Sequence, residues 1–122
     1  MIVLDRYQAL HTFWSSFGLQ AYDENTVPED VTFPYITYEA STASVNEKIP
    51  ASASLWYRST SWDEISRKAE QISEQISWGG SSVVYDTGRL WVTKEAPFAQ
   101  RMSEPSDSLV RRIVLQVSVE FQ

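Results

Sequence analysis

The last strand-like stretch of the chain is Leu109-Val-Arg-Arg-Ile-Val-Leu-Gln-Val-Ser-Val-Glu-Phe121, whose side chains alternate with the two-residue period of a β-strand. An apolar side of this kind predicts a strand that lies against a hydrophobic core. The segment is longer than a usual strand of about 5–6 residues, so we expect part of it to extend past the sheet. The side predicted to face the core carries Leu109, Arg111, Ile113, Leu115, Val117, Val119 and Phe121.

Two other segments have the three- and four-residue apolar spacing of amphipathic helices. The first covers residues 2–17 and stops at Gly18. The second covers residues 61–78; Ser61 and Glu64 form a capping box at its start, and Gly79-Gly80 supplies a left-handed cap at its end. The predicted apolar stripes are Val3, Tyr7, Leu10, Phe13, Trp14 and Phe17 in the first helix, and Ile65, Ala69, Ile72 and Ile76 in the second.

The remaining regular segments favour strands. Pro34 cannot donate a ladder hydrogen bond, so we expect its strand to lie at a sheet edge or to carry a bulge. Asp86-Thr87-Gly88 predicts a hairpin turn in which Gly88 takes a positive φ. The predicted strands are 31–40, 51–59, 82–85 and 89–94, and the predicted loops include 22–30 and 95–108.

The resulting order, α-β-β-α-β-β-β, predicts an α+β fold: a two-layer sandwich with a mostly antiparallel sheet and two helices on one face. At 122 residues the chain is long enough for one core, so residues 1–122 are expected to form a single domain.

Composition excludes several function classes. The formal net charge of −6 disfavours direct binding to nucleic acid, and the absence of cysteine excludes disulfides and thiolate metal sites. No apolar run approaches the roughly 20 residues of a membrane-spanning helix, and the N-terminus does not resemble a secretory signal. These features predict a soluble protein that is kept in the cytoplasm.

Catalytic motifs are weak. His11 is the only histidine, and a surface or packed helix residue explains it well. Asp86-Thr87-Gly88 matches the tripeptide of dimeric aspartic proteases, in which two carboxylates share a proton, but a hairpin turn also explains these residues. No acidic pair has the spacing of a calcium loop, and no glycine-rich phosphate loop opens a helix. We therefore expect no enzyme activity, no metal and no cofactor.

The sequence as a whole resembles the tail terminator and neck-proximal minor tail proteins of long-tailed bacteriophages and prophages. The resemblance rests on the order and coverage of similar stretches, because none is a functional signature by itself. These stretches are Leu4-Asp-Arg-Tyr-Gln-Ala-Leu-His-Thr-Phe-Trp-Ser-Ser-Phe-Gly18, Ala21-Tyr-Asp-Glu-Asn-Thr-Val-Pro28, Phe33-Pro-Tyr-Ile-Thr-Tyr38, Ala53-Ser-Leu-Trp-Tyr-Arg-Ser59, Pro97-Phe-Ala-Gln-Arg-Met102 and Arg111-Arg-Ile-Val-Leu-Gln-Val-Ser-Val-Glu-Phe121.

The resemblance implies a structural virion protein that is assembled in the bacterial cytoplasm. Such proteins form a hexameric ring that caps the tail tube, stops its polymerisation and joins it to the head–tail connector proteins. A connector or tail-completion protein and, from another class, a dimeric aspartic protease using Asp86 remain alternatives. Residues of types enriched at interfaces, and exposed in the predicted loop or at the start of the last strand, are the candidate subunit contacts: Phe98, Arg101, Met102, Arg111 and Arg112.

Overall fold

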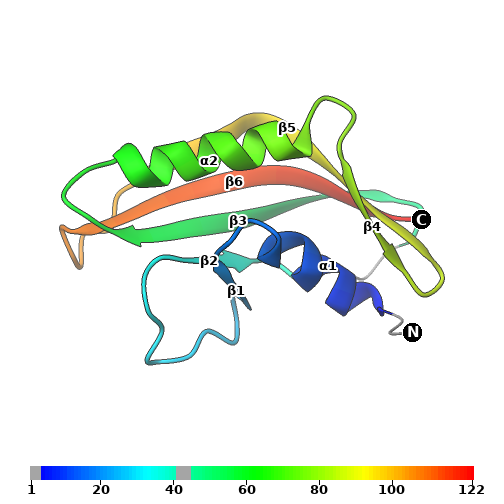
Figure 1. Ribbon diagram of the computed structural model, residues 1–122, viewed down its shortest axis with the longest axis horizontal. Coiled ribbons are helices and arrows are strands. Elements are labelled where there is room, and N and C mark those ends of the chain that lie inside the picture. The colour runs from blue at the N-terminus through cyan, green and yellow to red at the C-terminus, as the bar shows by residue number, and fades with distance from the viewer. Residues whose placement is uncertain (1–3, 41–44) are drawn as a thin grey trace.

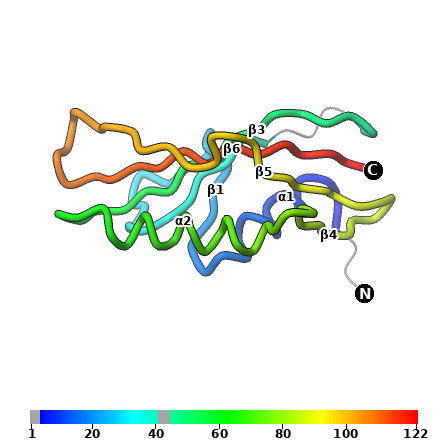
Figure 2. The backbone as a smooth tube through the Cα atoms, turned by 90° about the horizontal axis from the view of Figure 1, so that it is seen from above, coloured from blue at the N-terminus to red at the C-terminus, as the bar shows by residue number. Residues whose placement is uncertain are grey.

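A computed structural model describes residues 4–40 and 45–122 as an α+β fold with two helices and a mixed six-stranded sheet (Figure 1). The sheet order is β1-β2-β3-β6-β5-β4; β1 and β2 are parallel and the other neighbours are antiparallel. The sheet curls along its length, and α2 runs along β5 and β6 (Figure 2). The elements are α1 (Arg6–Ser15), β1 (Gln20–Asp23), β2 (Tyr35–Tyr38), β3 (Lys48–Arg58), α2 (Asp63–Ile76), β4 (Ser81–Tyr85), β5 (Gly88–Met102) and β6 (Val110–Phe121).

The long final strand, β6, lies in the middle of the sheet. It pairs with β3 from Lys48↔Glu120 to Arg58↔Val110, and with β5 from Leu90↔Phe121 to Met102↔Arg112. The expectation that part of it extends past the sheet is therefore wrong, because both neighbours are long enough to cover it. Neither β6 nor the strand after Pro34 is an edge strand.

The alternation predicted for β6 is confirmed for its central and C-terminal parts. Five of its apolar residues are buried against the helices and neighbouring strands, whereas Leu109 is 36% exposed and Arg111 is half-buried at the start of the strand. The hydrophobic core therefore does not reach the start of β6, where longer polar side chains lie instead. The buried apolar residues are Ile113, Leu115, Val117, Val119 and Phe121.

Helix α2 has the predicted apolar stripe but different caps. The Ser61 hydroxyl accepts from the Asp63 N–H at 2.9 Å, so the predicted capping box with Glu64 does not form. At the other end the positive φ values belong to Ser77 (51°) and Gly80 (88°), not to Gly79. The stripe itself is confirmed, because Ile65, Ala69, Ile72 and Ile76 are all buried.

Helix α1 is shorter than residues 2–17. It begins at a capping box between Asp5 and Gln8 and ends before Gly18, whose φ is +82°. Tyr7 of the predicted stripe is 56% exposed, and Val3 lies outside the described residues. Leu10, Phe13, Trp14 and Phe17 are buried as predicted.

One strand was not predicted. β1 begins before the predicted loop 22–30 and overlaps its first residues. It pairs in parallel with β2 through register partners such as Ala21↔Ile36. β1 thus covers the edge that we expected Pro34 to occupy, and Pro34 itself precedes β2. The edges of the sheet are β1 and β4.

The stretch 95–108, predicted as a loop, is largely a strand. β5 continues to Met102, with an irregular register between Lys94 and Ala99. Pro97 lies inside that irregularity, where a residue without an N–H interrupts the ladder least. The strand then resumes, so successive side chains beyond Ala99 point to opposite faces of the sheet.

Position 88 needs glycine because there is no space for a side chain, and not because of a left-handed backbone, since the φ of Gly88 is not positive. A Cβ at Gly88 would lie 1.6 Å from the Gln122 carbonyl oxygen, whereas a Cβ at Gly79 would meet nothing within 4 Å. The close approach of the C-terminal residue to the β4–β5 hairpin therefore depends on glycine at this position.

We predict that Gly88→Ala lowers the free energy of unfolding by about 1–3 kcal/mol, as expected for overpacking. The matched change Gly79→Ala should alter it by less than about 0.5 kcal/mol. Urea denaturation of both variants measures the difference, and equal stability would mean that Gln122 does not approach the hairpin.

We predict that Ile72→Ala costs about 2–5 kcal/mol of unfolding free energy, since Ile72 is fully buried against the sheet. Gln71→Ala, at the exposed neighbouring position, is the control and should be nearly neutral. Thermal denaturation followed by circular dichroism measures the difference. Equal unfolding temperatures for the two variants would contradict the packing of α2 against the sheet.

Candidate functional site

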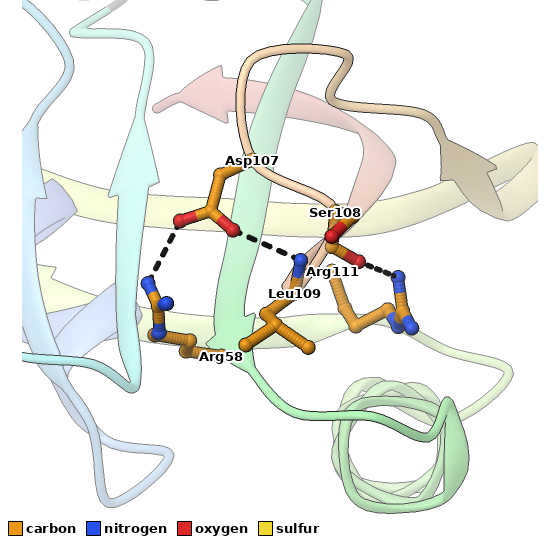
Figure 3. Close-up of polar contacts among 5 residues, drawn as sticks. All are labelled: Arg58, Asp107, Ser108, Leu109 and Arg111. Carbon is orange, nitrogen blue, oxygen red and sulfur yellow. Dashed lines mark hydrogen bonds and ion pairs between the residues drawn. The ribbon is translucent and has the colours of Figure 1, made fainter.

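The turn between β5 and β6 is held by Asp107 (Figure 3). One of its carboxylate oxygens accepts from the Leu109 N–H at 2.9 Å, and the other pairs with the Arg58 guanidinium at 2.7 Å. The Val110 N–H also donates to the Asp107 carbonyl at 3.2 Å. These contacts fix the start of β6 and therefore the two arginines that follow.

Arg101 and Arg111 lie against the same indole ring, that of Trp62 at the start of α2. Their guanidinium carbons are 4.9 Å and 5.4 Å from the ring centroid. Arg111 donates to the Ser108 carbonyl at 2.9 Å (Figure 3) and to the Thr60 carbonyl at 3.3 Å. We call Trp62, Arg101 and Arg111 the Trp62 cluster.

The two arginines of the Trp62 cluster have no carboxylate partner among residues 4–40 and 45–122. The ion pairs found there are Arg58–Asp107 and Arg112–Glu104. The Nε atom of Arg111 is buried and has no hydrogen-bond partner among the residues that the structure describes. Arginines held in place by cation–π and carbonyl contacts can receive an acidic group from outside the chain with little further loss of side-chain entropy.

A groove of about 310 Å³ adjoins this cluster, between α2 and β5. Phe98 packs against the core at its wall and is half-buried, so the expectation of an exposed Phe98 is corrected in part. Lys94 also approaches Phe98, with its Nζ 5.9 Å from the ring centroid, and is held by the Ser73 carbonyl at 2.9 Å. The groove is lined by Ser66, Ala69, Glu70, Ser73, Phe98, Ala99, Arg101 and Ile113.

Arg112 and Met102 belong to a different surface, on the opposite face of the sheet. Arg112 lies over the Trp56 ring at 4.7 Å, and Trp56 stacks on Tyr35 with a centroid distance of 6.0 Å and an angle of 13°. Direct register pairs connect Tyr35, Trp56, Arg112 and Met102 across four neighbouring strands. Arg112 also pairs with Glu104 at 3.6 Å, so its charge is balanced within the chain.

The structure thus divides the five predicted contact residues between two faces. Arg101 is the register partner of the buried Ile113 and Met102 that of Arg112, so adjacent residues of β5 point in opposite directions. A loop was expected to expose them together. The residue that sequence reasoning missed is Trp62, for which the only signal was its place inside the expected cap of α2.

His11 is exposed, and its ring nitrogen lies 3.0 Å from the Tyr38 hydroxyl. A second hollow of about 370 Å³ includes both residues, together with Asp23 and Tyr7. Burial, and then the nearby Asp23 carboxylate, raise the pKa of Tyr38 above its ordinary value. In the part of the chain that the structure describes, no group of three or more histidine, aspartate or glutamate side chains is placed to hold a metal ion.

Asp86 lies in the turn between β4 and β5, where its N–H donates to the Leu4 carbonyl at 2.7 Å. Its side chain is exposed. A hairpin turn between β4 and β5 therefore accounts for the position of Asp86. None of the described helices is long and apolar enough to cross a membrane.

The chain matches no protein-family model, no curated protein and no solved structure.

We predict an alkaline loss of stability through Tyr35, whose pKa is raised above 10.0 by burial first, then by Glu104 and Tyr22. A raised pKa means that the folded state favours the neutral phenol. This contribution is complete below pH 10 and is lost as the pH rises through the folded-state pKa.

Tyr35→Phe should therefore lose less stability than the wild type as the pH is raised above 10.0. Urea denaturation at a series of alkaline pH values measures this. Parallel pH curves for the two proteins would contradict the raised pKa.

Proposed function

We propose that this protein is a structural subunit of a phage tail, a terminator whose ring caps the tail tube and joins it to the head. The sequence resemblance is what suggests the tail. The observation that supports an interaction role is the Trp62 cluster, in which Arg101 and Arg111 lie on one indole ring without an acidic partner in the described residues.

Residue type supports the same role. Tryptophan and arginine are the residues most enriched among those that dominate binding energy at protein interfaces. Here both arginines are positioned before any partner arrives, because Ser108, Thr60 and Trp62 hold Arg111 while Ser66 lies 3.5 Å from Arg101. Positioned side chains lose less entropy on binding, which favours a contact surface.

A ring brings two different patches of one chain together, one on each neighbour. The Trp62 cluster is one candidate patch and is basic. Exposed carboxylates follow β1 in the loop that leads to β2, at Glu24, Glu29 and Asp30, and they are candidates for the complementary patch. Opposite charges on different patches of one acidic chain favour contact between copies in a defined orientation.

The proposal includes the finer architecture: a two-layer sandwich whose helices cover one face of the sheet and leave the other free. In support, the buried residues of α1 and α2 belong to a single hydrophobic cluster together with the inward residues of the strands. The opposite face, with Trp56 and Arg112, carries aromatic and charged side chains on which no helix residue stacks among those described.

A head–tail connector or tail-completion protein is the second candidate, because it would use the same kind of contact surface. Deletion of the gene from its phage separates the two functions. Overlong tails without heads, seen by negative-stain electron microscopy, would support the terminator, and unattached tails of normal length would support the connector.

We predict that Arg101→Glu reduces assembly of complete particles by about tenfold or more, since it places a negative charge where an acidic partner is expected. The protein itself should remain folded, because Arg101 is exposed. Arg67→Glu, an exposed arginine on α2, is the matched control and should assemble normally.

Complementation of the deleted phage with each variant, counted as infectious particles, measures this effect. Equal particle yields for Arg101→Glu and the wild type would remove the Trp62 cluster from the interface.

A further inference from the structure

A hollow of about 370 Å³ lies between α1 and the strand pair formed by β1 and β2. Helix α1 lies beside β1 (Figure 1). The hollow shares no lining residue with the groove between α2 and β5. Its volume falls within the range of small-molecule sites, roughly 300–1,000 Å³. The lining includes Leu4, Tyr7, His11, Asp23 and Tyr38.

The two strands bring a carboxylate and a phenol to one place. Asp23 and Tyr38 are the last residues of parallel strands and are register partners, so their side chains leave the same face of the sheet. Two residues earlier on that face, the partners Ala21 and Ile36 are both buried. The face that is apolar within the core therefore ends in two polar groups at the hollow.

Helix α1 supplies the other wall of the hollow. Tyr7 and His11 are four residues apart and therefore lie one above the other on the same side of the helix. Both side chains are exposed. The His11 Nδ1 lies 3.0 Å from the Tyr38 hydroxyl, and the two ring centroids are 6.0 Å apart. This contact connects the helix wall to the strand wall.

Asp23 gives the hollow a negative charge that no side chain balances within residues 4–40 and 45–122. One carboxylate oxygen accepts from the Asn25 N–H at 3.0 Å, and neither ion pair found in those residues includes Asp23. The lining, in the same part of the chain, contains no lysine or arginine. Burial, followed by the Asp23 carboxylate, raises the pKa of Tyr38, so the phenol favours its neutral form. Asp23 is therefore the charge that a ligand would meet.

We propose that this hollow binds the ammonium group of an organic cation that carries an apolar chain or ring. Asp23 pairs with the ammonium, and the rings of Tyr7 and Tyr38 add cation–π attraction. Leu4, which packs against the core at its other side, contacts the apolar part. An anion is repelled by Asp23, and a neutral molecule of the same shape lacks the ionic attraction. The site does not depend on the proposed terminator function, because it shares no residue with the Trp62 cluster.

The first test is titration of the purified protein with phenethylammonium, followed by the backbone amide signals in nuclear magnetic resonance spectra. Saturable shifts are expected in α1, β1 and β2, with a millimolar Kd. Phenethyl alcohol, the neutral molecule of nearly the same shape, should bind about tenfold more weakly or worse, since a hydrogen bond between charged groups is stronger than one between neutral groups. Equal affinity for the alcohol, or the absence of saturable shifts, would overturn the proposal.

Variants locate the site. Asp23→Asn keeps an oxygen for the Asn25 N–H and removes the charge, so it should weaken binding of phenethylammonium about tenfold or more while the protein stays folded. Tyr7→Ala, at a side chain that is 56% exposed, should weaken it about threefold through the loss of cation–π attraction. Asp30→Asn removes an exposed carboxylate outside the hollow and is the matched control. Thermal melts verify folding, and wild-type affinity in Asp23→Asn would also overturn the proposal.

A second ligand identifies the source of the cation. Nα-acetyl-lysine methylamide represents the lysine side chain of a partner protein, whereas phenethylammonium represents a free amine. Tighter binding of the lysine compound supports a partner's lysine as the natural occupant, and the reverse order supports a small amine. The terminator function would stand or fall separately on the tail lengths produced by the gene deletion.

Discussion

The pairing of β6 on both sides is the constraint on which the rest of the molecule depends. Because β3 and β5 flank it along its length, its backbone groups are satisfied within the sheet and one row of its side chains is committed to the core. The apolar stripe of α2 packs over this row, where Ile72 and Leu115 are both fully buried. Displacement of β6 by one residue would turn its whole buried row toward solvent.

The same strand sets the positions of the candidate contact residues. Alternation along β6 sends Arg111 to the side of α2 and Arg112 to the opposite face, and β5 separates Arg101 from Met102 in the same way. As a result, two arginines meet on Trp62, whereas Arg112 lies on Trp56 and is neutralised by Glu104. Arg112 has a carboxylate partner, whereas Arg101 and Arg111 have none among residues 4–40 and 45–122, and this difference distinguishes the two surfaces.

Aromatic residues account for much of this organisation. The chain has sixteen aromatic residues. Some, such as Trp14, lie in the core, and others, such as Trp56 and Trp62, lie under an arginine side chain. Trp78 is fully exposed, and the Lys94 Nζ lies 6.0 Å from its ring centroid.

Elements with a strong local periodicity could be predicted from the amino-acid sequence alone. The buried row of β6, the stripe of α2 and the burial of Leu10, Phe13 and Trp14 in α1 follow directly from apolar spacing. These patterns are reliable because a helix or strand must turn its apolar side toward the core wherever it lies.

Other features depend on contacts between residues that are distant in sequence, and these could not be predicted. β1 is a strand only because β2 pairs with it, and its polar sequence gives no periodic signal. Residues beyond Ala99 form a strand because β6 supplies the partner, which turned a predicted loop into a surface with two faces. The meeting of Trp62 with Arg101 and Arg111 joins segments far apart along the chain, and no local pattern could have revealed it.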